Sequence, residues 1–192
     1  MKSKVRKIAL FGTSADPPSN SHKIILEELS KLYKIVIAYA SNNPSKKHEE
    51  NLYFRSLLLE TLINDLNNPN IFFDQDLSSP WAINSIKKCQ EKYSSGEIDF
   101  VIGSDLLDEM FLWKNIHEIV KEVKLFVIPR EGYPLNGDNL KLLQKYKSNY
   151  EISEFRIPQM SSSMIRENSK HSGLPQSLIP IVKNNNLYNS SV

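Results

Sequence analysis

A short apolar strand that breaks into a polar loop and then opens a helix is the feature that most constrains this chain. The apolar run at residues 8–11 ends at Gly12, and a helical pattern begins near Ser19 and His22. The first turn of such a helix offers an anion unpaired backbone N–H groups and the positive end of the helix dipole. Because Ser19 and His22 are three positions apart, their side chains share one face of that turn. The segment predicts a phosphate site, although the same residues also suit an ordinary turn with a solvated histidine.

Short β-rich runs alternate with helical segments, as in a parallel sheet covered on both faces by helices. The predicted strands are residues 5–11, 34–40, 70–74, 98–103, 123–129 and 150–156. Predicted helices lie near residues 81–94, 106–121, 138–146, 162–169 and 176–185, and two further helical stripes run through residues 24–32 and 57–66. We therefore expect one Rossmann-like, doubly wound α/β domain over residues 1–192, with a mostly parallel sheet of five or six strands.

Four polar segments follow predicted strand ends: residues 12–22, 41–47, 103–105 and 130–133. In doubly wound folds the ligand lies beyond the carboxyl ends of the strands. We expect these four segments to face one cleft.

A second helix start, at residues 160–166, again combines hydroxyl side chains with a basic residue. Ser162 and Ser163 open this predicted helix, and Arg166 follows one turn later. The planar guanidinium of arginine can hold two phosphate oxygens at once. Two helix starts suited to phosphate in one chain strengthen the prediction of a nucleotide site.

These segments carry a family resemblance. Residues 12–22 resemble the Gly-Thr-Phe-Asp-Pro-x-His-x-Gly-His signature of bacterial nicotinate-nucleotide adenylyltransferases, and residues 160–166 resemble their Ile-Ser-Ser-Thr-x-Ile-Arg signature. Between them, residues 102–113 and 127–133 are similar to the family's Gly-x-Asp…Trp and Arg-x-Gly-Tyr segments. The resemblance runs over nearly the whole chain.

The resemblance implies adenylyl transfer. The 5′-phosphate of nicotinate mononucleotide would attack the α-phosphorus of ATP, pyrophosphate would leave, and deamido-NAD would form on the way to NAD. No covalent enzyme intermediate is expected. In such a reaction the protein mainly positions the two substrates and stabilises negative charge. Mg²⁺ is expected to be bound to the triphosphate of ATP.

Position by position, the resemblance implies catalytic roles for His22, Ser19 and Arg166. The residues implied for ATP binding are Gly12, Thr13, Ser19, His22, Gly103, Asp105, Ser162, Ser163 and Arg166. Those implied for the acceptor nucleotide are Lys46, Trp113 and Arg130, with Trp113 stacked on the pyridine ring and Asp105 on the ribose of adenosine. Four of them have plainer interpretations that stay open: Arg166 as a solvated charge, Asp105 as a helix cap, Trp113 as core and Lys46 as a solvated lysine.

The chain departs from the family pattern near the first helix. Ser19 stands where the family has its first histidine, Ser21 replaces a glycine, and one extra residue lies between Thr13 and Asp16. A hydroxyl can still donate to phosphate. The sequence leaves two alternatives: the same transfer to nicotinamide mononucleotide or another phosphate acceptor such as phosphopantetheine, and a regulatory protein that binds nucleotide without catalysis.

Composition adds few constraints. The chain has 192 residues, 40% of them hydrophobic, and its 24 basic and 22 acidic residues give a net charge of +2, too small to indicate nucleic acid. Its single cysteine, Cys89, excludes an internal disulfide and falls in a helical pattern, so we expect a packing or surface role and no metal cluster. Neither a signal peptide nor a membrane span is predicted, which suggests a cytoplasmic protein. The oligomeric state stays open, a homo-oligomer included.

Overall fold

A six-stranded parallel sheet forms the centre of the folded molecule. We analysed a computed structural model that describes residues 6–94, 96–158, 162–167 and 173–189. The strands follow the order β3-β2-β1-β4-β5-β6, and every neighbouring pair is parallel. They are β1 (Arg6–Thr13), β2 (Ile35–Ala40), β3 (Ile71–Phe73), β4 (Gly96–Gly103), β5 (Lys124–Ile128) and β6 (Tyr150–Ile152).

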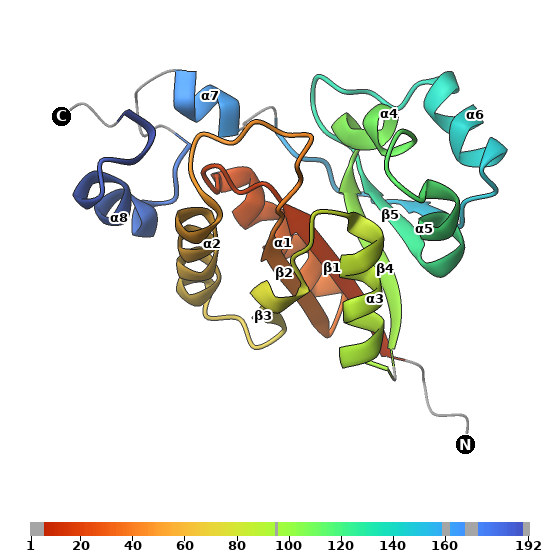
Figure 1. Cartoon of the computed structure of the whole chain (residues 1–192), viewed down its shortest axis with the longest axis horizontal. Helices are drawn as coiled ribbons and strands as arrows, with labels where there is room; N and C mark the ends of the chain where they lie inside the picture. Colours follow the sequence, from red (N-terminus) through yellow and green to blue (C-terminus); the bar gives the residue numbers. More distant parts are fainter. Residues whose placement is uncertain (1–5, 95, 159–161, 168–172, 190–192) are drawn as a thin grey trace.

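Helices connect the strands and cover the sheet (Figure 1). The α-helices in the described part are α1 (Asn20–Leu32), α2 (Leu52–Leu66), α3 (Ala82–Lys92), α4 (Leu107–Met110), α5 (Ile116–Glu122), α6 (Gly137–Lys145), α7 (Ser162–Glu167) and α8 (Ile179–Asn184). Short 3₁₀ helices occur at η1 (Gln75–Leu77), η2 (Ser104–Leu106), η3 (Gln176–Leu178) and η4 (Leu187–Asn189).

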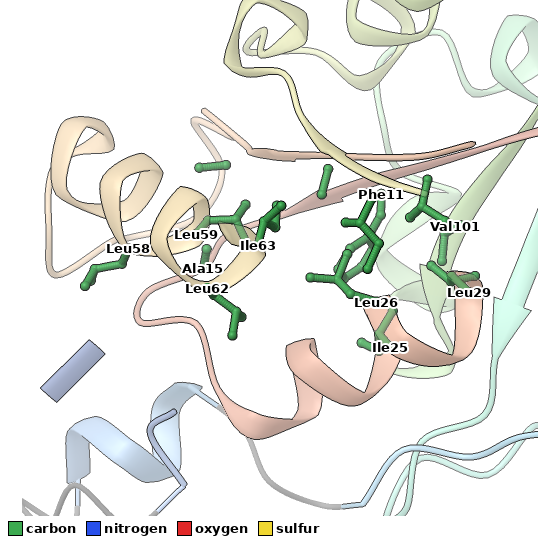
Figure 2. Close-up of a cluster of buried hydrophobic side chains, with 14 of the residues drawn as sticks. Phe11, Ala15, Ile25, Leu26, Leu29, Leu58, Leu59, Leu62, Ile63 and Val101 are labelled. Carbon is green, nitrogen blue, oxygen red and sulfur yellow. The ribbon is translucent and has the colours of Figure 1, made fainter. Parts of the chain in front are cut away.

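The central strands are apolar on both faces because each face is buried against helices. Successive residues of β1 alternate between the two cores: Ala9 and Phe11 belong to one, Ile8 and Leu10 to the other. Figure 2 shows part of the first core, to which Phe11 and leucine and isoleucine side chains of α1 and α2 belong. Side chains of α8 complete this core, and α3 and α5 build the second. Cys89 is fully buried in the second core, in agreement with a packing role.

The six predicted strands are confirmed, but the predicted helix at residues 106–121 is wrong. The chain there forms η2 and α4, then a turn, and only afterwards α5. Asn115 caps α5 with a left-handed backbone, at φ 59°, which interrupts helical geometry. Asparagine tolerates this conformation better than most residues. The predicted strand at 150–156 is also shorter, ending at Ile152.

The strand order places a topological switch between β1 and β4. From β1 the chain moves outward to β2 and β3, whereas β4 lies on the opposite side of β1 and continues outward to β5 and β6. Loops leaving the carboxyl ends of such a strand pair diverge and leave room for a ligand. The site is therefore expected at the end of β1 and β4. Within the described residues, no helix combines the length and the apolar character needed to cross a membrane.

Candidate active site

The loop between β1 and α1 fixes the imidazole of His22 through both of its nitrogens. Nε2 lies 2.8 Å from Thr13 Oγ1. The backbone N–H of Ser19 donates to Nδ1 at 3.0 Å, and Ser19 Oγ lies 2.9 Å from the same atom. Because a backbone N–H can only donate, Nδ1 is the acceptor, and the neutral ring carries its proton on Nε2. His22 therefore directs an N–H donor toward Thr13 at the carboxyl end of β1.

The surroundings of His22 favour its neutral form at physiological pH. Burial, and to a lesser extent the positive charge of Arg130, lower the pKa of His22 from 6.5 to about 4. An anion bound beside the ring would oppose both effects because it stabilises the imidazolium. The charge of His22 is thus sensitive to a bound phosphate.

Ser19 forms hydrogen bonds with His22 in this structure. It is the N-cap of α1 and is fully buried, and both of its donors face the imidazole. The neighbouring Asn20 N–H donates to Gly173 O at 2.8 Å, which ties the helix start to the C-terminal part of the chain. The serine that replaces the family's first histidine therefore orients the second one.

Gly12, predicted in the ATP site, has a structural reason to lack a side chain. A Cβ atom there would lie 2.5 Å from Oη of Tyr39, which pairs with Gly12 across β1 and β2. The glycine makes room for a buried tyrosine ring, a requirement that the sequence motif alone did not reveal.

The segments after β4 and β5 are joined by side chains. Arg130 Nη1 donates to Asp105 Oδ2 at 2.6 Å. Ser104 Oγ accepts from Arg130 N–H at 2.9 Å and donates to Tyr133 O at 2.7 Å. A Cβ on Gly103 would lie 2.3 Å from Asp105 Oδ1, so this glycine admits the carboxylate that Arg130 binds.

Arg130 lies close enough to His22 for its positive charge to lower the pKa of the imidazole. Trp113, in contrast, packs against the core. Trp113 is half-buried and packs edge-to-face on Phe100, with ring centroids 6.4 Å apart. Lys46 lies in the segment between β2 and α2 and is partly exposed. Its backbone N–H donates to Asn43 O at 3.3 Å.

The second motif docks on the first. Ser162 Oγ donates to Pro17 O at 2.8 Å, and Arg166 Nη1 donates to Asp16 O. Ser163, in the first turn of α7, is exposed. Met160 and Ser161, which precede them in the motif, lie outside the described residues. The hydroxyl of Ser162 and the guanidinium of Arg166 thus contact the loop that positions His22.

Asp16 organises the segment that precedes α2. Its carboxylate is almost fully buried and accepts the backbone N–H of Glu49 at 2.8 Å and of Glu50 at 3.2 Å. The residue after β2, Ser41, also reaches β1, because its N–H donates to Thr13 O at 2.7 Å. The loops after β1 and β2 are therefore joined, as the expectation that they face one cleft requires.

Arg55 is a site-building residue that the sequence motifs missed. It is 2% exposed, and its guanidinium donates to three carbonyl oxygens, those of Ser14 at 2.6 Å, Ser41 at 2.9 Å and Glu50 at 3.1 Å. The signal was present in the sequence as an arginine inside an otherwise apolar stretch of a helix. A buried arginine of this kind requires partners, and here the partners are the loops that frame the site.

One family model matches most of the chain. Residues 10–168 match the model described as Cytidylyltransferase-like, a range that contains both motifs. A protein of Synechocystis named "Probable nicotinate-nucleotide adenylyltransferase" is 28% identical over 95% of this chain and 98% of its own length. A protein of Flavobacterium psychrophilum with the same name is 30% identical over 91% of this chain and 92% of its own length.

Solved structures show the same fold. Nicotinic acid mononucleotide adenylyltransferase of Plasmodium falciparum, complexed with NaAD, superposes with a TM-score of 0.80 at 21% identity and covers 97% of this chain and 98% of that one. The same enzyme complexed with APC gives a TM-score of 0.77. Given the match to the family model and the identity to the Flavobacterium protein, the chain belongs to the cytidylyltransferase-like family and, within it, to the nicotinate-nucleotide adenylyltransferases.

Proposed function

We propose that this chain joins nicotinate mononucleotide and ATP to form deamido-NAD and pyrophosphate. The observation that carries the proposal is the docking of α7 on the loop after β1, which brings Ser162 and Arg166 to the segment that fixes His22. Imidazole, hydroxyl and guanidinium groups at one sheet edge are the donors that a triphosphate requires. The names of the relatives agree with this reaction.

The chemistry needs no covalent intermediate. An oxygen of the acceptor phosphate bonds to the α-phosphorus while the bond from that phosphorus to the bridging oxygen of pyrophosphate breaks. We assign His22 Nε2–H and the guanidinium of Arg166 to the phosphate oxygens, where donors stabilise the charge shared in the transition state. Ser19 keeps His22 in the tautomer that donates from Nε2.

Mg²⁺ is proposed to arrive on ATP as part of the substrate. No group of three or more His, Cys, Asp or Glu side chains within the described ranges could hold a metal ion. The triphosphate itself supplies the oxygen ligands that Mg²⁺ prefers.

We assign adenosine and acceptor recognition to the segments after β4 and β5. Asp105 is suited to accept hydrogen bonds from ribose hydroxyls, and its pairing with Arg130 fixes the carboxylate. Arg130, Lys46 and Trp113 are proposed for nicotinate mononucleotide. Nicotinamide mononucleotide differs by one group, which polar contacts can discriminate strongly.

Pyrophosphate release from Mg-ATP tests the function. The purified chain is offered nicotinate mononucleotide, nicotinamide mononucleotide and phosphopantetheine in parallel, and we expect turnover selective for the nicotinate form. Turnover of another acceptor would retain adenylyl transfer and correct the substrate. ATP binding without release from any acceptor would support the regulatory alternative, in which catalysis has been lost.

A further inference from the structure

Arg166 lies between acidic groups. Its Nε is 3.4 Å from Glu49 Oε2, and its Nη1 is 3.8 Å from Asp16 Oδ2. Nη1 also donates to the backbone oxygen of Asp16. The arginine that we assign to the triphosphate is therefore already paired with carboxylates of its own chain.

The backbone brings Glu49 to this place. The carboxylate of Asp16 accepts the N–H groups of Glu49 and Glu50, which fixes the segment before α2 against the loop after β1. Arg55 reinforces the same junction by donating to Glu50 O and Ser14 O. These bonds involve only backbone atoms of Glu49, so its side chain can move while the segment stays in place. About one third of that side chain is exposed.

We propose that Glu49 is an internal competitor for the guanidinium of Arg166, displaced when the triphosphate of ATP binds. This inference rests on the proposed function, because it requires Arg166 to hold phosphate. Glu49 thereby lowers the affinity for ATP and, by returning to Arg166 after the transfer, helps pyrophosphate to leave.

The geometry of a guanidinium supports competition. Nε–H points to the same side as one N–H of Nη2, and this edge is one of those that bind two anionic oxygens together. A carboxylate beside Nε covers that edge. A triphosphate brought to Arg166 would also meet the like charge of Glu49, which disfavours occupation by both.

The test replaces Glu49 by its neutral isostere. Glu49→Gln keeps the backbone N–H that Asp16 accepts and removes only the charge. Glu60→Gln is the matched control, because Glu60 is an exposed residue further along α2. Calorimetry with a non-hydrolysable ATP analogue and Mg²⁺ gives Kd, and the pyrophosphate assay gives KM and kcat.

We expect Glu49→Gln to tighten binding of the analogue roughly two- to fivefold, in the range of a partly exposed ion pair, and Glu60→Gln to leave it unchanged. KM for ATP should fall with Kd. The gain in affinity from Glu49→Gln should be smaller in an Arg166→Lys background. A lysine ammonium has no planar edge for which the carboxylate and the phosphate could compete.

Two results would overturn the inference while the wild type remains active. Weaker binding by Glu49→Gln would show that Glu49 positions Arg166 for ATP, and unchanged binding would show that the pair has no part in ATP affinity. A wild type that neither binds the analogue nor releases pyrophosphate would instead refute the proposed function, and this inference with it.

Discussion

The hydroxyl of Ser162 donates to the carbonyl oxygen of Pro17 at 2.8 Å across 145 positions of sequence. This bond seats α7 on the loop after β1, where Asp16 receives Arg166 and where Thr13 faces His22. This part of the candidate site is thus assembled from segments near the two ends of the chain, beside the central strand β1. Its expected behaviour follows from these contacts.

His22→Ala should lower kcat about 100-fold, the usual cost of losing one preorganised donor to a developing charge. Pyrophosphate release at saturating ATP and acceptor measures the effect. His117→Ala is the control, since His117 is an exposed histidine of α5 that packs on Tyr146. Near-normal kcat in the His22 variant would remove His22 from the mechanism.

Stability should depend on pH through His22. Its pKa is about 4 in the folded chain and 6.5 as a model value, so the unfolded chain binds the extra proton first as the pH falls. The free energy of unfolding should therefore decrease from about pH 6.5 down to about pH 4 because of this group. Urea unfolding of the wild type and of His22→Gln over that window measures the difference. Parallel curves for the two proteins would contradict a depressed pKa.

Arg55→Lys should destabilise the chain by about 2–4 kcal/mol, because one ammonium cannot serve the three carbonyl oxygens that the guanidinium serves. Urea denaturation reports the change, with the exposed Arg156→Lys as control. Since Arg55 joins the loops that frame the site, KM for ATP should rise as well. A stable variant with unchanged KM would show that these bonds are dispensable.

Gly103→Ala and Asp105→Ala should act through the same contact. A methyl group at Gly103 would stand 2.3 Å from Asp105 Oδ1 and push the carboxylate away from Arg130. Each single change should raise KM for ATP about tenfold, as the loss of a charge-assisted hydrogen bond does. In the Asp105→Ala background, Gly103→Ala should then add little. Additive effects in the double variant would show that Gly103 acts by another route.

The sequence by itself determined the sheet, because hydrophobic runs of strand length flanked by polar turns occur in only a few arrangements. All six strands follow from this pattern. It also indicated that strand ends would gather, since parallel strands end at one edge. The prediction of one helix at residues 106–121 was wrong because the apolar periodicity continues through the turn at Asn115. At that residue the backbone becomes left-handed while the sequence pattern does not change.

Only the tertiary structure decided which partner each site residue has. Periodicity describes one segment at a time, whereas hydrogen bonds such as Ser162 to Pro17 join segments far apart in sequence. The sequence suggested that Ser19 faces phosphate, and the fold shows it holding His22. The family resemblance placed Gly12 among the residues that bind ATP, and the fold shows that this glycine also makes room for the ring of Tyr39. The ion pair of Arg166 with Glu49 belongs to the same class, because burial and distance set it and no local pattern encodes either.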